Sequence, residues 1–406
     1  MNKNIKLAVA GAVLALSASA ANAGIIIPAG DWTLDVNGNV NAYANWTRSK
    51  DSNDVLGGLA GKREAGTGEK NTQGINTGLL PAWLGFTGTT RQNDVDVSFT
   101  ISMQPNASDN ANSGDAKAPL FRQSFLTFGD KSWGSIKLGK DIGIFASDAI
   151  LNDMTLLGVG GGAANSGGST TLGGIGTGYI YAAWKGQATY TTPNFNGFQA
   201  SLGITNPNQG ASTQGFTEGG GVASGVSTLN QDRFGVEAKA SYSFAVNDVT
   251  GKVWVSGASN KVKPTTDIEY TATVADIGAN VNVANFGVTG YYYNGEGAGT
   301  TMFLNQGASA TGKKRDSDGG YVQLTYKLPT NTKIGYAYGI SKLDRASDEN
   351  VASTLVKENT RHTVGLYHPL TKHLNLVAEY NNIQSENHQS QENKSHTGSL
   401  GAILFF

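Results

Sequence analysis

Strict alternation of apolar and polar side chains along several long segments is the feature that most constrains the fold of this chain. From 32 to 46, the even-numbered positions carry Trp, Leu, Val, Ala or Gly, and the odd-numbered positions carry Thr, Asp, Tyr or Asn. The same period of two runs through 95–103, 233–244 and 398–406. Successive side chains of an extended strand point to opposite faces, so each segment predicts a β-strand with one apolar and one polar face.

Strand length and aromatic placement separate a membrane barrel from a soluble sandwich, which also alternates. The segments are about ten residues or longer, whereas strands of soluble proteins average about five or six. Several apolar faces carry aromatic residues near their ends, such as Trp32 and Trp46, or Phe234 and Tyr242. Aromatic girdles mark transmembrane barrels, and in hydrocarbon a sheet must close to satisfy its edges. We therefore predict an all-β fold, a transmembrane antiparallel β-barrel.

The connections between the predicted strands alternate between short and long, which gives the strand count. Sixteen strands follow, with both chain ends on the short-turn side, and a barrel of that size leaves an aqueous lumen. A smaller number of strands remains an alternative, because the ends of the weaker segments are less clearly marked in the sequence. The short connections are 91–94, 129–134, 193–197, 245–248, 283–285, 328–331 and 369–373, and the long ones are 48–74, 105–119, 141–186, 206–232, 258–269, 294–318, 342–359 and 384–395.

Both chain ends carry further signals. Residues 1–23 contain Lys3 and Lys6, a short apolar stretch and a final Ala-Asn-Ala, which predicts a secretory signal peptide cleaved after Ala23. The alternative is a membrane anchor, although the apolar stretch is short for a bilayer. Residues 24–406 then form one barrel domain. Its terminal strand places Phe406 on the apolar face, so we expect this last residue to contact lipid.

The connection 141–186 is long for a barrel loop and contains many apolar residues, so we expect it to fold into the lumen. Residues 144–157 within it are expected to form a short helix capped near Ser147 or Asp148. The alternative is a surface loop that shields the mouth of the barrel.

The block "FRQSFLTFGDKSWGSIKLGKD", followed by a loop with "NDM" and "GVGG" and then by "ATYTTPNFNGFQASLGI", resembles the general diffusion porins of Gram-negative outer membranes. The resemblance covers the whole mature chain and is most specific over 120–205. It implies a homotrimer of sixteen-stranded barrels without a cofactor, located in the cell outer membrane. It also implies passive diffusion of small hydrophilic solutes and ions past an inward third loop. The terminal Phe406 would be read by the outer-membrane assembly machinery.

The resemblance also assigns a pore constriction, where acids on the loop face bases on the wall. Asp153 matches the loop acid and Arg122 a wall arginine, whose inward phase would leave Phe121 and Phe125 facing out. Lys137, Lys140 and Arg48 are further candidates for lumen charge, and Asp148 is a second acid on the loop; Lys137 is equally explained as a solvated lumen residue. The chain departs from the family at Asn39, Trp83 and Thr191, where basic wall residues are common, and at Leu157, where a second loop acid is common.

Other functions fit the residues less well. An outer-membrane barrel enzyme would need a nucleophile beside a histidine, but the five His all lie in the last part of the chain and no G-x-S-x-G motif is present. His388 and His396 are a weak metal pair, and solvated side chains explain them better. The glycines of 158–163 lack the setting of a dinucleotide site. A channel selective for one nutrient class remains an alternative, hinted at by the tyrosines of 290–297. The absence of Cys excludes disulfides, and the net charge of -1 argues against nucleic acid as a partner.

Overall fold

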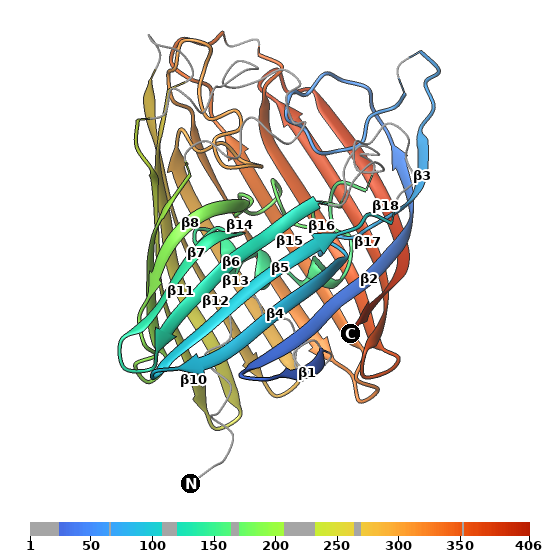
Figure 1. The fold of residues 1–406 in the computed structure, drawn as a ribbon. Coiled ribbons are helices and arrows are strands. Elements are labelled where there is room, and N and C mark those ends of the chain that lie inside the picture. The colour runs from blue at the N-terminus through green and yellow to red at the C-terminus, as the bar shows by residue number, and fades with distance from the viewer. Residues whose placement is uncertain are drawn as a thin grey trace.

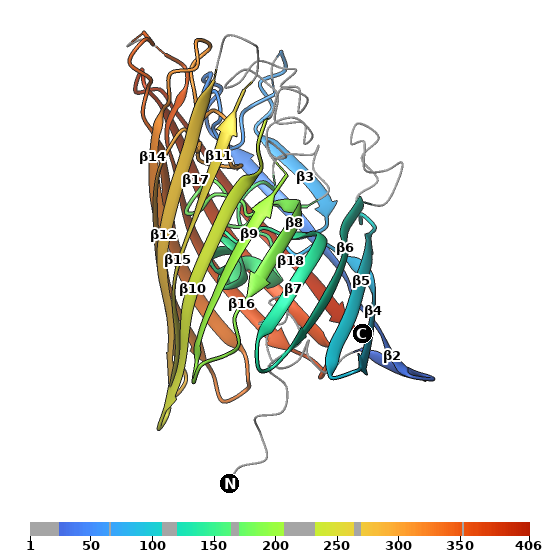
Figure 2. The ribbon, with the colours of Figure 1, turned by 60° about the vertical axis from the view of Figure 1, so that its left-hand side comes forward.

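A computed structural model describes residues 24–64, 66–107, 120–163, 170–206, 232–263, 269–350 and 353–406. These residues form a closed antiparallel barrel, with short turns at one end and long loops at the other (Figures 1 and 2). The predicted signal peptide, 1–23, lies outside the described residues. No helix within the described ranges is long and apolar enough to cross a membrane.

The strands follow the chain around the barrel, and each pairs with the next from β4 onward. The pairing of β9 with β10 and of β18 with β2 closes the sheet. Their bounds are β1 Ile25–Ala29, β2 Trp32–Ser49, β3 Asn71–Asn76, β4 Trp83–Gln92, β5 Val95–Gln104, β6 Leu120–Asp130, β7 Gly134–Ile142, β8 Trp184–Thr191, β9 Phe198–Thr205, β10 Gly235–Val246, β11 Val249–Val262, β12 Tyr270–Val283, β13 Phe286–Glu296, β14 Asp316–Lys327, β15 Lys333–Leu343, β16 Val356–Pro369, β17 Leu374–Asn387 and β18 Glu392–Phe405.

These segments occupy sixteen positions in the wall, as the sequence predicted. β1 pairs with the start of β2 and β18 with the rest of it, so the two ends of the chain share one position. On the other side of β2, β3 pairs with 43–48 and β4 with 33–39, so they share another. The break between β3 and β4 contains Pro81, which has no backbone N–H to donate.

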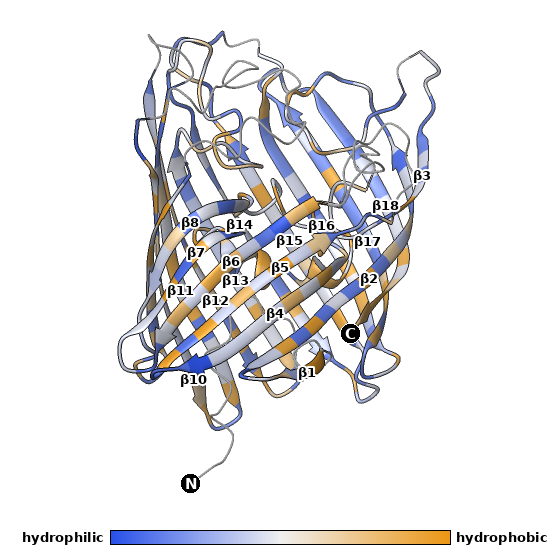
Figure 3. Ribbon diagram, in the orientation of Figure 1, coloured by the Kyte–Doolittle hydropathy of each residue, from blue (hydrophilic) through white to orange (hydrophobic). Residues whose placement is uncertain are grey.

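The two faces of the wall follow the predicted alternation. Val40 and Trp46 of β2 are 59% and 50% exposed on the outside, whereas Asn41 and Asn45 are each 1% exposed on the inside. Figure 3 shows hydrophobic and hydrophilic residues alternating along the strands. An apolar outer face and a polar inner face are what a barrel in lipid with a polar interior requires.

The seven short connections lie where they were predicted. One of the two-residue connections, Asn93 and Asp94, has positive φ at both residues, the geometry of a tight hairpin turn. Several long connections are shorter than predicted, and two of them differ most. β11 extends into 258–269 as far as Val262, and 384–395 is reduced to the turn 388–391. Polar residues there are strand residues, and some of their side chains bond the connection that follows β2. Ser385 of β17, for example, accepts hydrogen bonds from the backbone N–H groups of Leu59 and Ala60.

The outer loops are held by charged contacts of their own. Arg315, beside β14, donates to Glu349 in the connection 344–355, with a distance of 2.9 Å from Nε to Oε2. Hydrogen bonds from Arg315 lower the pKa of Glu349 below its ordinary value. The two loops therefore stay tied together at neutral pH.

The connection between β7 and β8 lies inside the barrel over its described residues, 143–163 and 170–183, as predicted (Figures 1 and 2). It contains one short helix, α2 Ser147–Leu151, and a 3-10 turn, η2 Met154–Leu157, in place of a single helix over 144–157. The predicted caps are also different. The N-cap of α2 is Ala146 without a side-chain bond, and Asp153 caps η2 by accepting from the backbone N–H of Thr155.

Candidate pore constriction

The inward loop, defined as residues 143–183, is bound to the wall at a series of polar anchors that begin on β10. The Oε2 atom of Glu237 accepts from the backbone N–H groups of Ile144 at 2.7 Å and Phe145 at 3.0 Å. Farther along the loop, Asp148 forms ion pairs with Lys239 of β10, at 2.9 Å, and with Lys252 of β11. A buried carboxylate surrounded by N–H groups or cations has its charge compensated, so these contacts fix the loop start on this wall.

The next anchors come from β14. The hydroxyl of Tyr321 donates to the carbonyl of Ala149 at 2.8 Å. The Gln323 amide bonds the loop twice, because its oxygen accepts from Met154 N at 2.9 Å and its nitrogen donates to Asn152 O at 2.6 Å. One side chain thus satisfies both a donor and an acceptor of the turn that joins α2 to η2.

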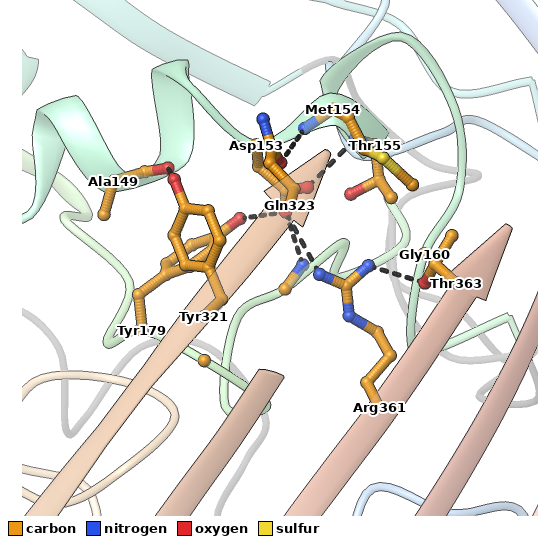
Figure 4. A network of polar contacts seen from close by, with 12 residues as sticks. Ala149, Asp153, Met154, Thr155, Gly160, Tyr179, Tyr321, Gln323, Arg361 and Thr363 are labelled. Carbon is orange, nitrogen blue, oxygen red and sulfur yellow. Dashed lines mark hydrogen bonds and ion pairs between the residues drawn. The ribbon is translucent and has the colours of Figure 1, made fainter. Parts of the chain in front are cut away.

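Asp153 lies at the centre of the loop and connects its two halves (Figure 4). Its Oδ2 atom accepts from Gly174 N and from the Tyr179 hydroxyl, both at 2.9 Å. The same oxygen lies 3.6 Å from Nη2 of Arg361 on β16, and both side chains are almost fully buried. We expected Asp153 to face Arg122; the structure pairs it with Arg361.

The last anchors are on β17 and β2. Glu379 of β17 accepts from the backbone N–H groups of Val159 at 3.0 Å and Gly160 at 2.8 Å. On β2, the hydroxyl of Tyr43 donates to Leu157 O at 2.6 Å. The loop is therefore bound to strands from β10 to β17 and on to β2, which is more than half of the circumference.

Apolar packing reinforces the same half of the barrel. Phe145, Ile150 and Tyr179 of the loop are buried against wall residues that include Trp254 and Tyr321. The rings of Tyr179 and Tyr321 meet edge to face, with centroids 5.7 Å apart. Burial of this much apolar surface favours one fixed position of the loop.

The wall formed by β4 to β7 differs, because several of its inward side chains remain partly exposed, although Ser102, Gln123 and Asp141 are buried. Thr100, Phe125 and Thr127 lie on this inner face, and Lys137 places its ammonium 5.0 Å from the centre of the Phe125 ring. The prediction that Phe125 faces out was wrong. A bulge gives β6 one extra residue between Leu120 and Gln123, and this residue reverses the phase of the strand after Arg122.

The basic candidates divide between the two faces. Arg122 sits at the bulge, partly buried, and its charge acts on Tyr181 of the inward loop. Lys137 faces inward and is paired with Asp141. Lys140 lies on the outer face with Leu138, and it bonds Phe121 O at 3.1 Å. Arg48 also lies outside, in phase with Trp46. Neither Lys140 nor Arg48 therefore adds charge to the lumen. Lys140 lies three residues after the inward-facing Lys137, and Arg48 lies two residues after the outward-facing Trp46, so both side chains point outward.

The neutral candidates all lie on the inner side. Asn39 is buried and donates to Pro81 O at 2.9 Å, and Trp83 packs against Phe405 with centroids 6.4 Å apart. Thr191 bonds Ser201 at 2.9 Å. Leu157 lies on the inward loop and packs beside Tyr43. They come from separated parts of the wall and do not form one cluster.

The anchors Glu237, Gln323, Arg361 and Glu379 were not selected from the sequence as site residues. Alternation placed Glu237 on the polar face of its strand but could not distinguish an anchor from a solvated side chain. The sequence signal that could have revealed the charged anchors is an acid or arginine at an inward-facing position of a long strand, because a buried charge needs a partner.

The histidines form no metal-binding cluster among the described residues. No three His, Asp or Glu side chains there come close enough to hold a metal ion. His388 bonds Leu343 O at 2.9 Å, and His396 bonds the Tyr380 hydroxyl at 2.8 Å.

Comparison with known proteins supports a channel. A family profile described as "Gram-negative porin" matches residues 9–388. No curated protein sequence matches the chain.

Solved structures share the fold. The outer membrane channel DcaP of Acinetobacter baumannii has a TM-score of 0.69 and 16% identity, over 95% of this chain and 100% of that chain. An anion-selective porin from Comamonas acidovorans has a TM-score of 0.62 and 13% identity, over 92% and 100% of the two chains. Salmonella typhi OmpF, in complex with daunomycin, has a TM-score of 0.59 and 16% identity, over 94% and 100%.

Proposed function

The chain belongs to the Gram-negative porin family and is a passive diffusion channel of the outer membrane, and from this premise we propose that the inward loop forms its constriction. The observation that carries the proposal is the one-sided attachment of the loop. Its anchors run from β10 to β17 and β2, whereas part of the inner face of β4 to β7, including Thr100, Phe125 and Lys137, keeps partial exposure. Small hydrophilic solutes and ions pass between the loop and this exposed wall, and the width left there sets the size limit.

The charges beside this path are basic. Arg122 lies on β6 and Lys137 on β7, while Asp153 is paired with Arg361 and Asp148 with two lysines. The loop acids are therefore compensated, Lys137 is paired with Asp141, and the positive charge of Arg122 acts on Tyr181 of the inward loop. We infer that the constriction favours anions over cations of the same size.

Arg122→Gln should shift the reversal potential of the channel toward cations, because it removes a positive charge beside the path. The shift should shrink as salt rises, since the Debye length is about 10 Å at 0.1 M and about 3 Å at 1 M. The measurement is the zero-current potential of the purified protein in a planar bilayer under a salt gradient.

Lys140→Gln is the matched control for Arg122→Gln. It makes the same change of charge on a neighbouring strand, but its side chain lies on the outer face. Its reversal potential should equal that of the wild type. A shift with Lys140→Gln as large as with Arg122→Gln, or no shift with Arg122→Gln at low salt, would place the path elsewhere.

We also propose that the protein works as a homotrimer, is delivered by the outer-membrane assembly machinery and catalyses no reaction. A trimer fits the family, and an apolar outer wall is available for contacts between barrels. Against an enzyme, the rings of His362 and His396 bond Tyr336 and Tyr380, both exposed tyrosines, at 2.8 Å. A channel selective for one nutrient class remains the alternative, and solute competition during conductance measurements would reveal it.

The mature chain is proposed to begin at Gly24, after cleavage of 1–23. Intact-mass measurement of the protein from outer membranes should give the mass of 24–406. Ala23→Tyr should slow cleavage and leave uncleaved precursor, because the cleavage site requires a small residue. Normal processing of that variant would contradict the assigned position.

A further inference from the structure

A second loop, which belongs to the connection between β13 and β14, is also covered by protein. We define it as residues 297–309, and all of them except Asn305 are buried. Leu304 and Ala308 are each 1% exposed. Loops normally run over the protein surface, where water satisfies their backbone groups. A buried run of this length therefore has protein partners, and they are found on the inward loop.

The backbone of the second loop pairs with the last part of the inward loop. The N–H of Tyr181 donates to Thr301 O at 2.9 Å, and the backbones of Tyr181 and Met302 form an isolated parallel β-bridge. The two loops also meet at Gly176, where an added Cβ would lie 2.6 Å from Oγ1 of Thr301. At this point the loops touch with no room for a side chain between them.

The ring of Phe303 joins the second loop to both ends of the inward loop. Its centroid lies 6.0 Å from that of Phe145, near the start of the inward loop. It also lies 5.2 Å from Nζ of Lys185 on β8, just after the end of that loop. Lys185 is paired with Glu237, the anchor that accepts from Ile144 N and Phe145 N. Ring and cation contacts of this kind are favourable, so Phe303 holds the two ends of the inward loop together.

Tyr181 is the residue of this junction that reaches the path. It keeps partial exposure, whereas its neighbours 173–180 and 182–183 are buried. The charge of Arg122, on β6, acts on this tyrosine. Tyr181 thus lies on the free side of the inward loop, toward β6, and the second loop lies behind it. The space between Tyr181 and β6 is part of the width that remains for solutes.

We propose that the second loop positions Tyr181 opposite Arg122 and thereby sets the width of the path at this point, a claim that rests on the constriction proposed above. Thr301 and Met302 fix the backbone of Tyr181, and Phe303 fixes the ends of the inward loop. Tyr181 is a lining residue that limits how far an ion passes from Arg122. Phe303 touches no solute and is a positioning residue that acts through Tyr181.

Single-channel recording of the purified full-length mature protein tests the proposal with Phe303→Ala. Loss of the ring leaves a cavity into which the structure partly relaxes, so Tyr181 should move back from β6 and the path should widen. The unit conductance should rise. At low salt the zero-current potential should move toward cations, by up to the full shift of Arg122→Gln, because ions then pass farther from Arg122. Each record comes from one inserted channel, so poor folding lowers the number of channels and leaves the unit conductance unaffected.

Leu355→Ala and Phe303→Leu are the control and the rescue. Leu355→Ala also empties a buried site near the barrel mouth, but Leu355 packs with Val55 and Leu343 in a cluster that contains no residue of the inward loop. Its conductance and zero-current potential should equal those of the wild type. Phe303→Leu restores much of the apolar volume and should recover most of the wild-type conductance.

A double variant tests whether Phe303 acts through Tyr181. Tyr181→Ala removes the lining side chain itself and should raise the unit conductance at least as much as Phe303→Ala does. Adding Phe303→Ala to Tyr181→Ala should then change the conductance little, because two residues that act through one contact are not additive. Full additivity of the two changes would show that the second loop acts elsewhere, and the positioning role would be wrong.

The results also separate this inference from the constriction on which it rests. If Arg122→Gln shifts the zero-current potential but Phe303→Ala conducts like the wild type, the constriction stands and the inference fails. Equal changes in Phe303→Ala and Leu355→Ala would reduce the effect to a general loosening of the mouth, which also overturns it. Absence of a shift with Arg122→Gln at low salt would overturn the constriction and this inference with it.

Discussion

Arg361→Met should loosen the inward loop and make the open channel unstable. The guanidinium of Arg361 is 1% exposed and compensates Asp153, which in turn holds Gly174, Tyr179 and Thr155. Removing one partner of a buried ion pair leaves an uncompensated charge and costs about 3–5 kcal/mol. The Asp153 carboxylate must then be hydrated, which requires the middle of the loop to move away from β16.

Two measurements detect this movement of the inward loop away from β16. Single-channel recordings should show more frequent closures and noisier open currents, because the loop can occupy more than one position. Proteolysis of the folded protein should cut within 143–183 at a higher rate, since the free energy of opening this segment has fallen.

The chain offers a matched control and a rescue for Arg361→Met. Lys357→Met also removes a cation from β16, but Lys357 is a half-exposed partner of Glu386 and should matter little. Adding Asp153→Asn to Arg361→Met removes both charges, so the double variant should be less disturbed than Arg361→Met alone. If Arg361→Met behaves like Lys357→Met, the loop is held without this pair.

Deleting Phe406 should strongly reduce the amount of assembled protein in the outer membrane. The backbone of Phe406 extends the seam between β18 and β2 by one pair of bonds, because its N–H donates to Gly38 O at 3.0 Å and its carbonyl accepts from Gly38 N at 2.8 Å. The ring covers Gly38, where an added Cβ would lie 2.7 Å from Cζ of Phe406. Deletion removes this last pair of backbone bonds and the ring of Phe406, and it leaves the inward-facing Phe405 at the end of the chain.

Phe406→Ser separates these two contributions, because it retains the backbone bonds and removes the ring. If the assembly machinery reads the aromatic residue, Phe406→Ser should be nearly as defective as the deletion. The measurement is the yield of heat-modifiable trimer in outer-membrane fractions, with synthesis and signal cleavage unchanged.

Phe195→Ser is a suitable comparison for the terminal variants. Phe195 is an exposed aromatic residue in the short connection between β8 and β9, and its loss leaves the seam intact. Normal assembly of Phe195→Ser beside a defect in Phe406→Ser supports a role for the terminus itself. Full assembly of Phe406→Ser would reduce that ring to a lipid contact.

The sequence determined the barrel because its decisive information is local. Alternation along 32–46 predicts which side chains contact lipid. The lengths of the strands and connections predict a closed wall of sixteen positions. The position of 143–183 inside that wall was also predictable, since its apolar residues need cover and no other part of the chain offers as much. The outward direction of Lys140 could also be predicted locally, because Lys140 lies three residues after Lys137 on the same strand and therefore points to the opposite face.

Tertiary structure decided the pairings of the charges. Asp153 and Arg361 are far apart in the sequence, and nothing near either residue states that they meet. The bulge that turns Phe125 inward depends on the register between β5 and β6, so alternation alone gave the wrong face. Local periodicity fixes the face of each side chain, whereas a charge finds its partner through the closure of the barrel, which brings distant strands and the loop within a few ångströms.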